Sequence, residues 1–538
     1  MREADLKVIE RGLKSAASAE QMEAARKLRE LLSSERDSLV HEVLLRGWVP
    51  HLLSWLKLRE QPLLQVEALW ALTNIAAGTV EHTHVLIKHG AVPTLVTLLD
   101  SPDEEVLEQA VWVLGNLAGE GVSARDAVLQ AGALEPLLRC LDGTPKISLL
   151  RIATWTLSNL FDGQPRPVLD MPRVLAVLAA LLDNTDTEVL SHVCWALSHL
   201  CDGPATYIVH VASADVCWRL VELLMHNSWR VNKPALRAIG NIVCAEEDTD
   251  YTQHVIDCGA VANLAILVEH SNREIQKEAC WTLSNIAAGT AEQIQHVLDS
   301  KSMPPLVALA RAVDTDPEVK SEACWVVLNA TSCGSDAQID FLVKEGCVPV
   351  LCELLAESSM VVMALEGLER ILQVGDDKSR GNGGSNPYAA LMASASIEGR
   401  STSRARLPAG VPGRRAAASF RSSLRQILAG QEEAEKEAQK VRRGAPCILV
   451  PALACSLTRA AHHRCNSAPH PAGGEAQEEG REEEKTEGEA RDDGRRLWFC
   501  GRYQEPRNLT CSQSEPLPLE RDSEPTSGHD DGCDGHDR

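Results

Sequence analysis

The sequence has few aromatic residues, and they are unevenly distributed. Phenylalanine, tyrosine and tryptophan make up 4% of the 538 residues, and 11 of them are tryptophan whereas only 4 are tyrosine and 4 are phenylalanine. An ordinary hydrophobic core draws on all three rings. We therefore expect the tryptophans to serve a task besides packing.

Positive charge is also in deficit. The chain has 53 Lys and Arg against 76 Asp and Glu, which gives a formal net charge of -23 at pH 7. This balance repels the phosphates of nucleic acids and suits a cationic partner. We expect a basic peptide as the ligand and no nucleic acid.

Long apolar segments and cysteine pairs are missing as well. The start, MREADLKVIERGLKSA, lacks the apolar stretch of a secretory signal, and the run from Cys447 to Leu457 contains Pro451 and is too short to span a bilayer. None of the 17 cysteines forms a C-x-x-C pair, and most lie in apolar helical stretches, as Cys194, Cys244, Cys280 and Cys324 do. This pattern predicts reduced, buried thiols in a soluble protein of the cytoplasm and nucleus, with no membrane association.

Motifs of catalytic sites are absent too. The sequence contains no P-loop, no G-x-S-x-G, no H-E-x-x-H and no paired carboxylates in a credible setting, and its His462–His463 pair lies in a low-complexity segment. We expect no enzyme activity, no catalytic residue, no metal and no cofactor.

What the chain does contain is an internal repeat. From residue 17 to about 375, Leu, Ala and Val recur at helical spacing, and seven segments such as ALWALTNIAAG align without gaps. Their aligned Trp or Arg positions are 42, 43, 40, 42, 44 and 44 residues apart, at residues 70, 112, 155, 195, 237, 281 and 325. This period is typical of armadillo and HEAT repeats, so the fold is predicted to be an all-α, right-handed armadillo superhelix of about nine repeats.

A glycine recurs before the helix pair of each repeat. It begins Gly47-Trp-Val-Pro50, Gly90-Ala-Val-Pro93, Gly132-Ala-Leu-Glu-Pro136, Gly259-Ala-Val and Gly346-Cys-Val-Pro349. Glycine permits a tight reversal and proline is tolerated in the first turn of a helix. Each repeat should be a short helix followed by two longer antiparallel helices.

Composition divides the chain into three parts. Residues 1–16 form a short N-terminal helix or extension, residues 17–375 the repeats, and residues 376–538 a low-complexity region that we expect to be mostly disordered. That region contains one plausible helix, Ser419 to Arg443, and a basic stretch, Arg400 to Arg425. We expect the basic stretch to be solvated, with binding to the chain's own peptide site as the alternative.

The repeated W-x-x-x-N lies on the third helix of each repeat. Residues four apart share a helix face, so stacked repeats should form a Trp/Asn ladder along a concave groove. An asparagine amide can hold a peptide backbone straight, and neighbouring indoles can receive Lys or Arg stems at about 0.5 to 2 kcal/mol per contact. Packing of repeat against repeat would explain one Trp, but asparagine is a poor core residue, so five Trp/Asn pairs favour a ligand.

The segment from about Ala17 to Asp376 resembles importin alpha, the adaptor for proteins with nuclear localisation signals. The resemblance covers about two thirds of the chain and is carried by EQAVWVLGNLAGE, WTLSNLFDGQPRP, NKPALRAIGNIV and KEACWTLSNIAAG. It implies binding of cargo proteins through their Lys- and Arg-rich signals.

By matching positions, the resemblance implies two groups of binding residues. The major site would consist of Trp70, Asn74, Gly78, Thr83, Gln109, Trp112, Asn116, Glu120, Trp155 and Asn159, with Gly78, Thr83 and Glu120 around the key lysine. The minor site would consist of Arg237, Asn241, Glu278, Trp281, Ser284, Asn285, Glu322, Trp325 and Asn329, and Arg237 would separate the two sites. Glu67, Glu278 and Glu322 each precede a Trp by three residues and are expected either to attract cations or to be solvated.

The sequence departs from the family in three places. Nothing before Ala17 resembles the arginine-rich importin-beta-binding segment, so neither importin beta binding nor autoinhibition carries over. Trp195 is followed by His199 instead of Asn, and we expect His199 to be a satisfied polar residue. Asn386 to Leu391 resembles the start of a tenth repeat, but the sequence diverges from Ala393, so binding of the export receptor does not carry over either.

A catenin-like armadillo scaffold is the alternative function. Such proteins share the fold, but they have a strongly basic groove for acidic ligands and lack a regular Trp/Asn ladder. The charge along the ladder therefore distinguishes the two functions.

Overall fold

The computed structural model describes residues 2–34, 36–143, 145–245, 251–355, 357, 359–382 and 386–398. All regular structure in these residues is α-helical, with turns and irregular segments between the helices and no strand. The described residues fall into two compact units, 2–160 and 161–398. The predicted all-α armadillo class is confirmed.

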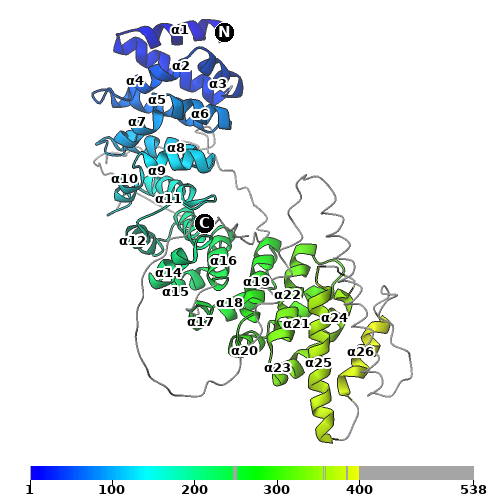
Figure 1. Ribbon diagram of the computed structural model, residues 1–538. Helices are drawn as coiled ribbons and strands as arrows, with labels where there is room; N and C mark the ends of the chain where they lie inside the picture. The colour runs from blue at the N-terminus through cyan, green and yellow to red at the C-terminus, as the bar shows by residue number, and fades with distance from the viewer. Residues whose placement is uncertain are drawn as a thin grey trace, which may run out of the picture. The chain divides into compact units, whose positions relative to one another are not determined.

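The first unit contains helices α1 to α11. In Figure 1 these blue to cyan helices lie in successive layers in chain order, and α2, α5 and α8 pack one on the next. The helices are α1 (Arg2–Lys14), α2 (Ser18–Ser34), α3 (Arg36–Leu45), α4 (Val49–Trp55), α5 (Pro62–Ala76), α6 (Val80–Lys88), α7 (Ala91–Leu98), α8 (Glu104–Gly119), α9 (Val122–Gln130), α10 (Leu134–Cys140) and α11 (Ile147–Phe161).

The second unit contains α12 to α26. Its long helices α13, α16, α19, α22 and α25 pack in that order, as the green to yellow part of Figure 1 shows. The helices are α12 (Met171–Leu181), α13 (Thr187–Cys201), α14 (Ala205–Ser213), α15 (Cys217–Leu223), α16 (Trp229–Val243), α17 (Tyr251–Asp257), α18 (Ala260–Leu267), α19 (Arg273–Ala287), α20 (Ala291–Asp299), α21 (Met303–Arg311), α22 (Pro317–Cys333), α23 (Asp336–Lys344), α24 (Cys347–Leu354), α25 (Val361–Asn382) and α26 (Pro387–Glu398).

The helices of a repeat differ from the prediction in length. In α6 to α8 the first helix has 9 residues, the second 8 and the third 16, so only the third is long. The repeat of α12 and α13 lacks a first helix, because Pro165 and Pro167 lack the N–H groups that a helix there would need. Arg166 holds this irregular segment by donating to the carbonyl of Phe161 at 2.7 Å and by pairing with Asp202.

The predicted glycine turns are present. Gly47, Gly90, Gly132, Gly259 and Gly346 have φ between 66° and 87°, each between the first and second helix of a repeat. Two repeats have other residues at the same turn, Asp215 with φ 55° and Lys301 with φ 63°. An L-residue adopts this conformation at a cost that glycine avoids.

Both ends of the repeat region are helical. The N-terminal residues form α1, which is the first of the two alternatives for residues 1–16, and α1 packs on α2. At the other end, the boundary drawn at Gly375 falls inside α25, and α26 contacts both α24 and α25. Buried Asn386 ties this corner together by donating to the carbonyl of Leu372 at 2.8 Å. The helix at Ser419 to Arg443, the basic stretch at Arg400 to Arg425 and the expected disorder beyond residue 398 lie outside the described residues.

Candidate functional site

The first Trp/Asn group lies on the third helices of the first unit. Trp70 is on α5, Trp112 on α8 and Trp155 on α11, and the last two form one buried cluster with Trp70 packed against it. The ring of Trp155 lies against Gly115 so closely that a Cβ there would be 2.3 Å from its Cζ3 atom. Trp155 therefore packs directly on the third helix of the previous repeat.

The asparagine amides join neighbouring repeats. Asn116 donates to the carbonyl of Thr73 at 3.4 Å and Asn159 donates to that of Gly115 at 3.0 Å. Asn74 differs, because it donates to Trp70 in its own helix at 3.1 Å. A structural role thus accounts for part of the asparagine recurrence that the sequence pattern assigned to a ligand.

Three polar atoms of this group are buried without a hydrogen-bond partner in the described part of the chain. They are the Oδ1 atom of Asn74, the Oε1 atom of Gln109 and the indole Nε1 of Trp112. Their residues are 0%, 5% and 7% exposed. Buried polar atoms in native structures are normally paired. Two acceptors and one donor in one group are what an extended peptide backbone could satisfy.

The residues expected around the key lysine of the peptide lie near the ends of two different third helices. Thr83 is buried on α6, and its hydroxyl donates to the carbonyl of Ala76 at 3.5 Å, just before Gly78. A Cβ at Gly78 would be 2.2 Å from Nδ1 of His82, so a side chain there would require the His82 ring to move. Glu120 is half-buried at the C-terminal end of α8. The structure thus brings Gly78 and Thr83 together at the end of α5.

Trp70 already has a cation of this chain over its ring. The guanidinium carbon of Arg29, on α2, is 5.5 Å from the ring centroid. The same Arg29 donates to Glu67 at 2.6 Å, and Arg26 is 3.6 Å from that carboxylate. Glu67, expected to attract a ligand cation or to be solvated, is therefore paired within the chain.

The second group, on α16, α19 and α22, repeats this arrangement. The guanidinium of Arg237 is 5.4 Å from the ring centroid of Trp281 and pairs with Glu278. Burial raises the pKa of Glu278, although Arg237 and two nearby lysines lower it, and the second carboxylate oxygen has no hydrogen-bond partner in the described residues. Arg237 was expected to separate two sites, and here it covers a tryptophan of the second.

The remaining residues of the second group lie on α19 and α22. Asn329 donates to the carbonyl of Ser284 at 2.8 Å, whereas Asn285 donates to Trp281 in its own helix at 3.0 Å. Asn241 follows the inter-repeat pattern, donating to Ser198 at 3.1 Å. Glu322, three residues before Trp325, has no ion pair in the described residues. Burial and the nearby Glu278 carboxylate raise its pKa to about 7.

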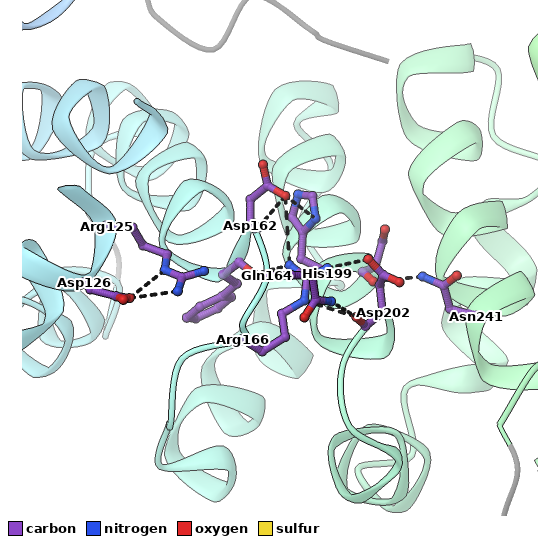
Figure 2. A network of polar contacts seen from close by, with 11 residues as sticks. Arg125, Asp126, Asp162, Gln164, Arg166, His199, Asp202 and Asn241 are labelled. Carbon is purple, nitrogen blue, oxygen red and sulfur yellow. Dashed lines mark hydrogen bonds and ion pairs between the residues drawn. The ribbon is translucent and has the colours of Figure 1, made fainter. Parts of the chain in front are cut away.

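His199 has the satisfied polar environment that the sequence predicted. Its ring stacks on Trp195 with centroids 5.8 Å apart, and its Nδ1 atom is 3.5 Å from the Asp162 carboxylate. Figure 2 shows Asp162 pointing at this ring, with Gln164 and Arg166 directed to Asp202 below. Lys233, on α16, lies over the Trp195 ring, with its Nζ atom 6.0 Å from the ring centroid.

Sequence reasoning missed Arg29 and Lys233. Each lies in the repeat next to that of the tryptophan that it covers, as Arg237 does relative to Trp281. The signal was a basic residue on an adjacent third helix, but charges on solvated helix faces give the same signal.

Further features of the described residues concern metal-ligand clusters, membrane-spanning helices and cysteines. They contain no group of three or more His, Cys, Asp and Glu side chains that could hold a metal. None of the helices described is long and apolar enough to cross a membrane. Cys194, Cys280 and Cys324 are buried as predicted, while Cys244 is half-buried, and burial raises the pKa of Cys194 and Cys280 to about 12.

Comparison with known proteins identifies the repeat family. The family model of the armadillo/beta-catenin-like repeat matches residues 79–119, 122–162, 164–202, 248–288 and 290–332. Among solved structures, an engineered protein superposes with a TM-score of 0.66 at 28% identity, over 80% of this chain and 98% of that chain.

Curated relatives are similar over most of the repeat region. The chain is 46% identical over 385 residues to importin subunit alpha-1b of Oryza sativa subsp. japonica, which covers 71% of each chain. It is 46% identical to importin subunit alpha-4 of Arabidopsis thaliana, over 69% of this chain and 70% of that one. Importin subunit alpha-B of Dictyostelium discoideum is 46% identical, over 68% and 70%. Together with the armadillo repeats and the Trp/Asn ladder, these similarities show that the chain belongs to the importin alpha family of nuclear import adaptors.

Proposed function

We propose that this protein binds the Lys- and Arg-rich nuclear localisation signals of cargo proteins along its third helices. A signal peptide would contact either the first group, through Trp70, Trp112 and Trp155, or the second group, through Trp281 and Trp325. The observation that carries this proposal is the set of unpaired buried atoms on Asn74, Gln109 and Trp112. An extended peptide supplies N–H and C=O groups to such atoms, and its basic side chains suit the indole faces.

The intrachain cations support the same chemistry. Arg29 over Trp70 and Arg237 over Trp281 each combine an indole face with a carboxylate three residues earlier. A ligand lysine or arginine would find comparable surroundings at Trp325, where Glu322 takes the position of Glu67 and Glu278. The face is thus built for cations at several successive positions.

A catenin-like scaffold is less well supported. Such a function needs a strongly basic face for acidic ligands, whereas on this face Arg29 and Arg237 are paired with Glu67 and Glu278, and Glu322 adds a further acid. The protein would act as an adaptor in cytoplasm and nucleus rather than as an enzyme, without nucleic acid or membrane as partner. Importin beta and the export receptor stay outside the proposal.

A competition assay with two peptides distinguishes binding of basic signals from a catenin-like scaffold function. A fluorescent peptide of the K-K/R-x-K/R type should be displaced from the full chain by an unlabelled copy and not by a peptide with Glu at every basic position. Preferential binding of the acidic peptide would overturn the proposed function in favour of the scaffold.

A further inference from the structure

Trp195 differs from the other ladder tryptophans in how its ring is covered. His199 stacks on the ring with centroids 5.8 Å apart, and the Nζ atom of Lys233 is 6.0 Å from its centroid. Lys233 is only 3% exposed, although lysine is rarely buried. The chain therefore places its own lysine on an indole face that a peptide lysine would otherwise use.

The position of Lys233 in α16 extends its effect along the helix. Lys233 and Arg237 are four residues apart and share one helix face. Arg237 covers Trp281 and pairs with Glu278, and the charge of Lys233 also reaches Glu278 and lowers its pKa. Two positive charges thus lie between Trp195 and the acidic pair of Glu278 and Glu322.

The tryptophans of the second unit consequently divide into two classes. A cation of this chain covers Trp195 and Trp281, whereas the described residues place none over Trp325. At Trp281 the charge of Arg237 is paired with Glu278, so a peptide cation can still use that ring. At Trp195 a peptide lysine would meet the like charge of Lys233 in a buried setting. Like charges juxtaposed at an interface oppose binding and thereby exclude wrong partners.

Resting on the proposed function, we propose that Lys233 is a specificity-determining residue that closes the Trp195 face to peptide lysine and arginine and favours an acidic residue there. The preferred ligand of the second unit is then a peptide whose basic cluster reaches Glu322 and Trp325. Its continuation toward α13 is acidic or neutral.

The test uses peptides that share one basic cluster and differ in six flanking residues on each side. The flanks are alanine and serine, or include glutamates, or include lysines, and binding to the full chain is measured by fluorescence anisotropy. We expect the glutamate flanks to bind about three- to tenfold more tightly than the lysine flanks to the unchanged protein. Lys233→Met should reduce that ratio at least threefold, and Lys233→Arg should keep it.

Control variants distinguish failure of the proposed role of Lys233 from failure of the proposed function. Lys277 aligns with Lys233 one repeat later and covers no tryptophan ring in the described residues, so Lys277→Met should leave the flank preference unchanged. Circular dichroism checks folding, and Lys233→Gln serves as a second neutral variant if Lys233→Met does not fold. An unchanged ratio in a folded neutral variant would overturn the role of Lys233. Absence of binding by every peptide would instead contradict the proposed function.

Discussion

The side-chain amide of Asn159 donates a hydrogen bond of 3.0 Å to the main-chain carbonyl of Gly115 in the preceding third helix. The bond recurs from Asn116 to Thr73, from Asn241 to Ser198 and from Asn329 to Ser284. Each bond links the third helices of two neighbouring repeats. Its acceptor is the carbonyl of the residue just before the position that aligns with the donor asparagine. The asparagine ladder therefore holds neighbouring repeats in register before any ligand is present.

This relationship predicts different stability effects for two asparagines. Asn329→Ala removes an inter-repeat bond of 2.8 Å and should lower the free energy of unfolding by about 1 kcal/mol. Asn285→Ala removes only a bond to Trp281 in its own helix, and because alanine favours the helix, stability should hardly change. Urea denaturation measures both, and equal losses would show that the inter-repeat bond is not the cause.

Gly115 and Gly240 should resist substitution by alanine. A Cβ would be 2.3 Å from Trp155 at the first position and 2.2 Å from Trp281 at the second. Alanine normally stabilises a helix by about 1 kcal/mol relative to glycine, but overpacking costs about 1 to 3 kcal/mol. We expect a net loss of stability and a shift in tryptophan fluorescence for Gly240→Ala. A gain in melting temperature would contradict this packing.

The turn residues with positive φ predict a gain in stability. Lys301 has φ 63° where other repeats have glycine, so Lys301→Gly should add about 0.5 to 1 kcal/mol by removing backbone strain. Asp215→Gly should act in the same direction. Gly346→Ala, at φ 86°, is the opposite control and should destabilise. Thermal unfolding distinguishes these signs, and a loss with Lys301→Gly would show that its side chain matters more than its backbone.

Peptide binding by the second group should depend on pH near neutrality. Burial and Glu278 raise the pKa of Glu322 to about 7, from an ordinary 4.5, with Glu278, Lys277, Glu318 and Arg237 as the charged groups that act on it. In the folded protein Glu322 keeps its proton up to about pH 7, whereas in the unfolded chain it loses the proton near pH 4.5, so stability falls as the pH rises between these two values. A bound cation favours the carboxylate, so affinity should rise several-fold from pH 6 to pH 8.

Peptide binding to the second group can be measured alone in a variant whose first group is disabled. In the Trp112→Ala/Asn116→Ala double variant, the pH series should report on the remaining site, and adding Glu322→Gln should flatten it. The same slope with glutamine at residue 322 would assign the pH dependence to another group.

The sequence predicted the features that depend on the repeat period and on local backbone conformation. The repeat spacing located the third helices, and glycine before the second helix located the left-handed turns, because both follow from residues close in the chain. The second helices are shorter than predicted, and α25 passes the boundary drawn at Gly375. The contacts of Arg29, Lys233 and Asn159 bridge repeats and depend on side-chain direction, which period alone does not give.

The most direct test of the account is the affinity of one basic peptide for three versions of the full chain. Anisotropy titration of a K-K/R-x-K/R peptide should give tight binding to the unchanged protein. It should give at least tenfold weaker binding to Trp112→Ala/Asn116→Ala, because that variant removes the centre of the first group. Trp218→Ala removes an exposed tryptophan of α15 outside the ladder and should bind like the unchanged protein. Equal affinity for all three, or equal binding of a peptide with alanine at every basic position, would contradict a cation-binding Trp/Asn ladder.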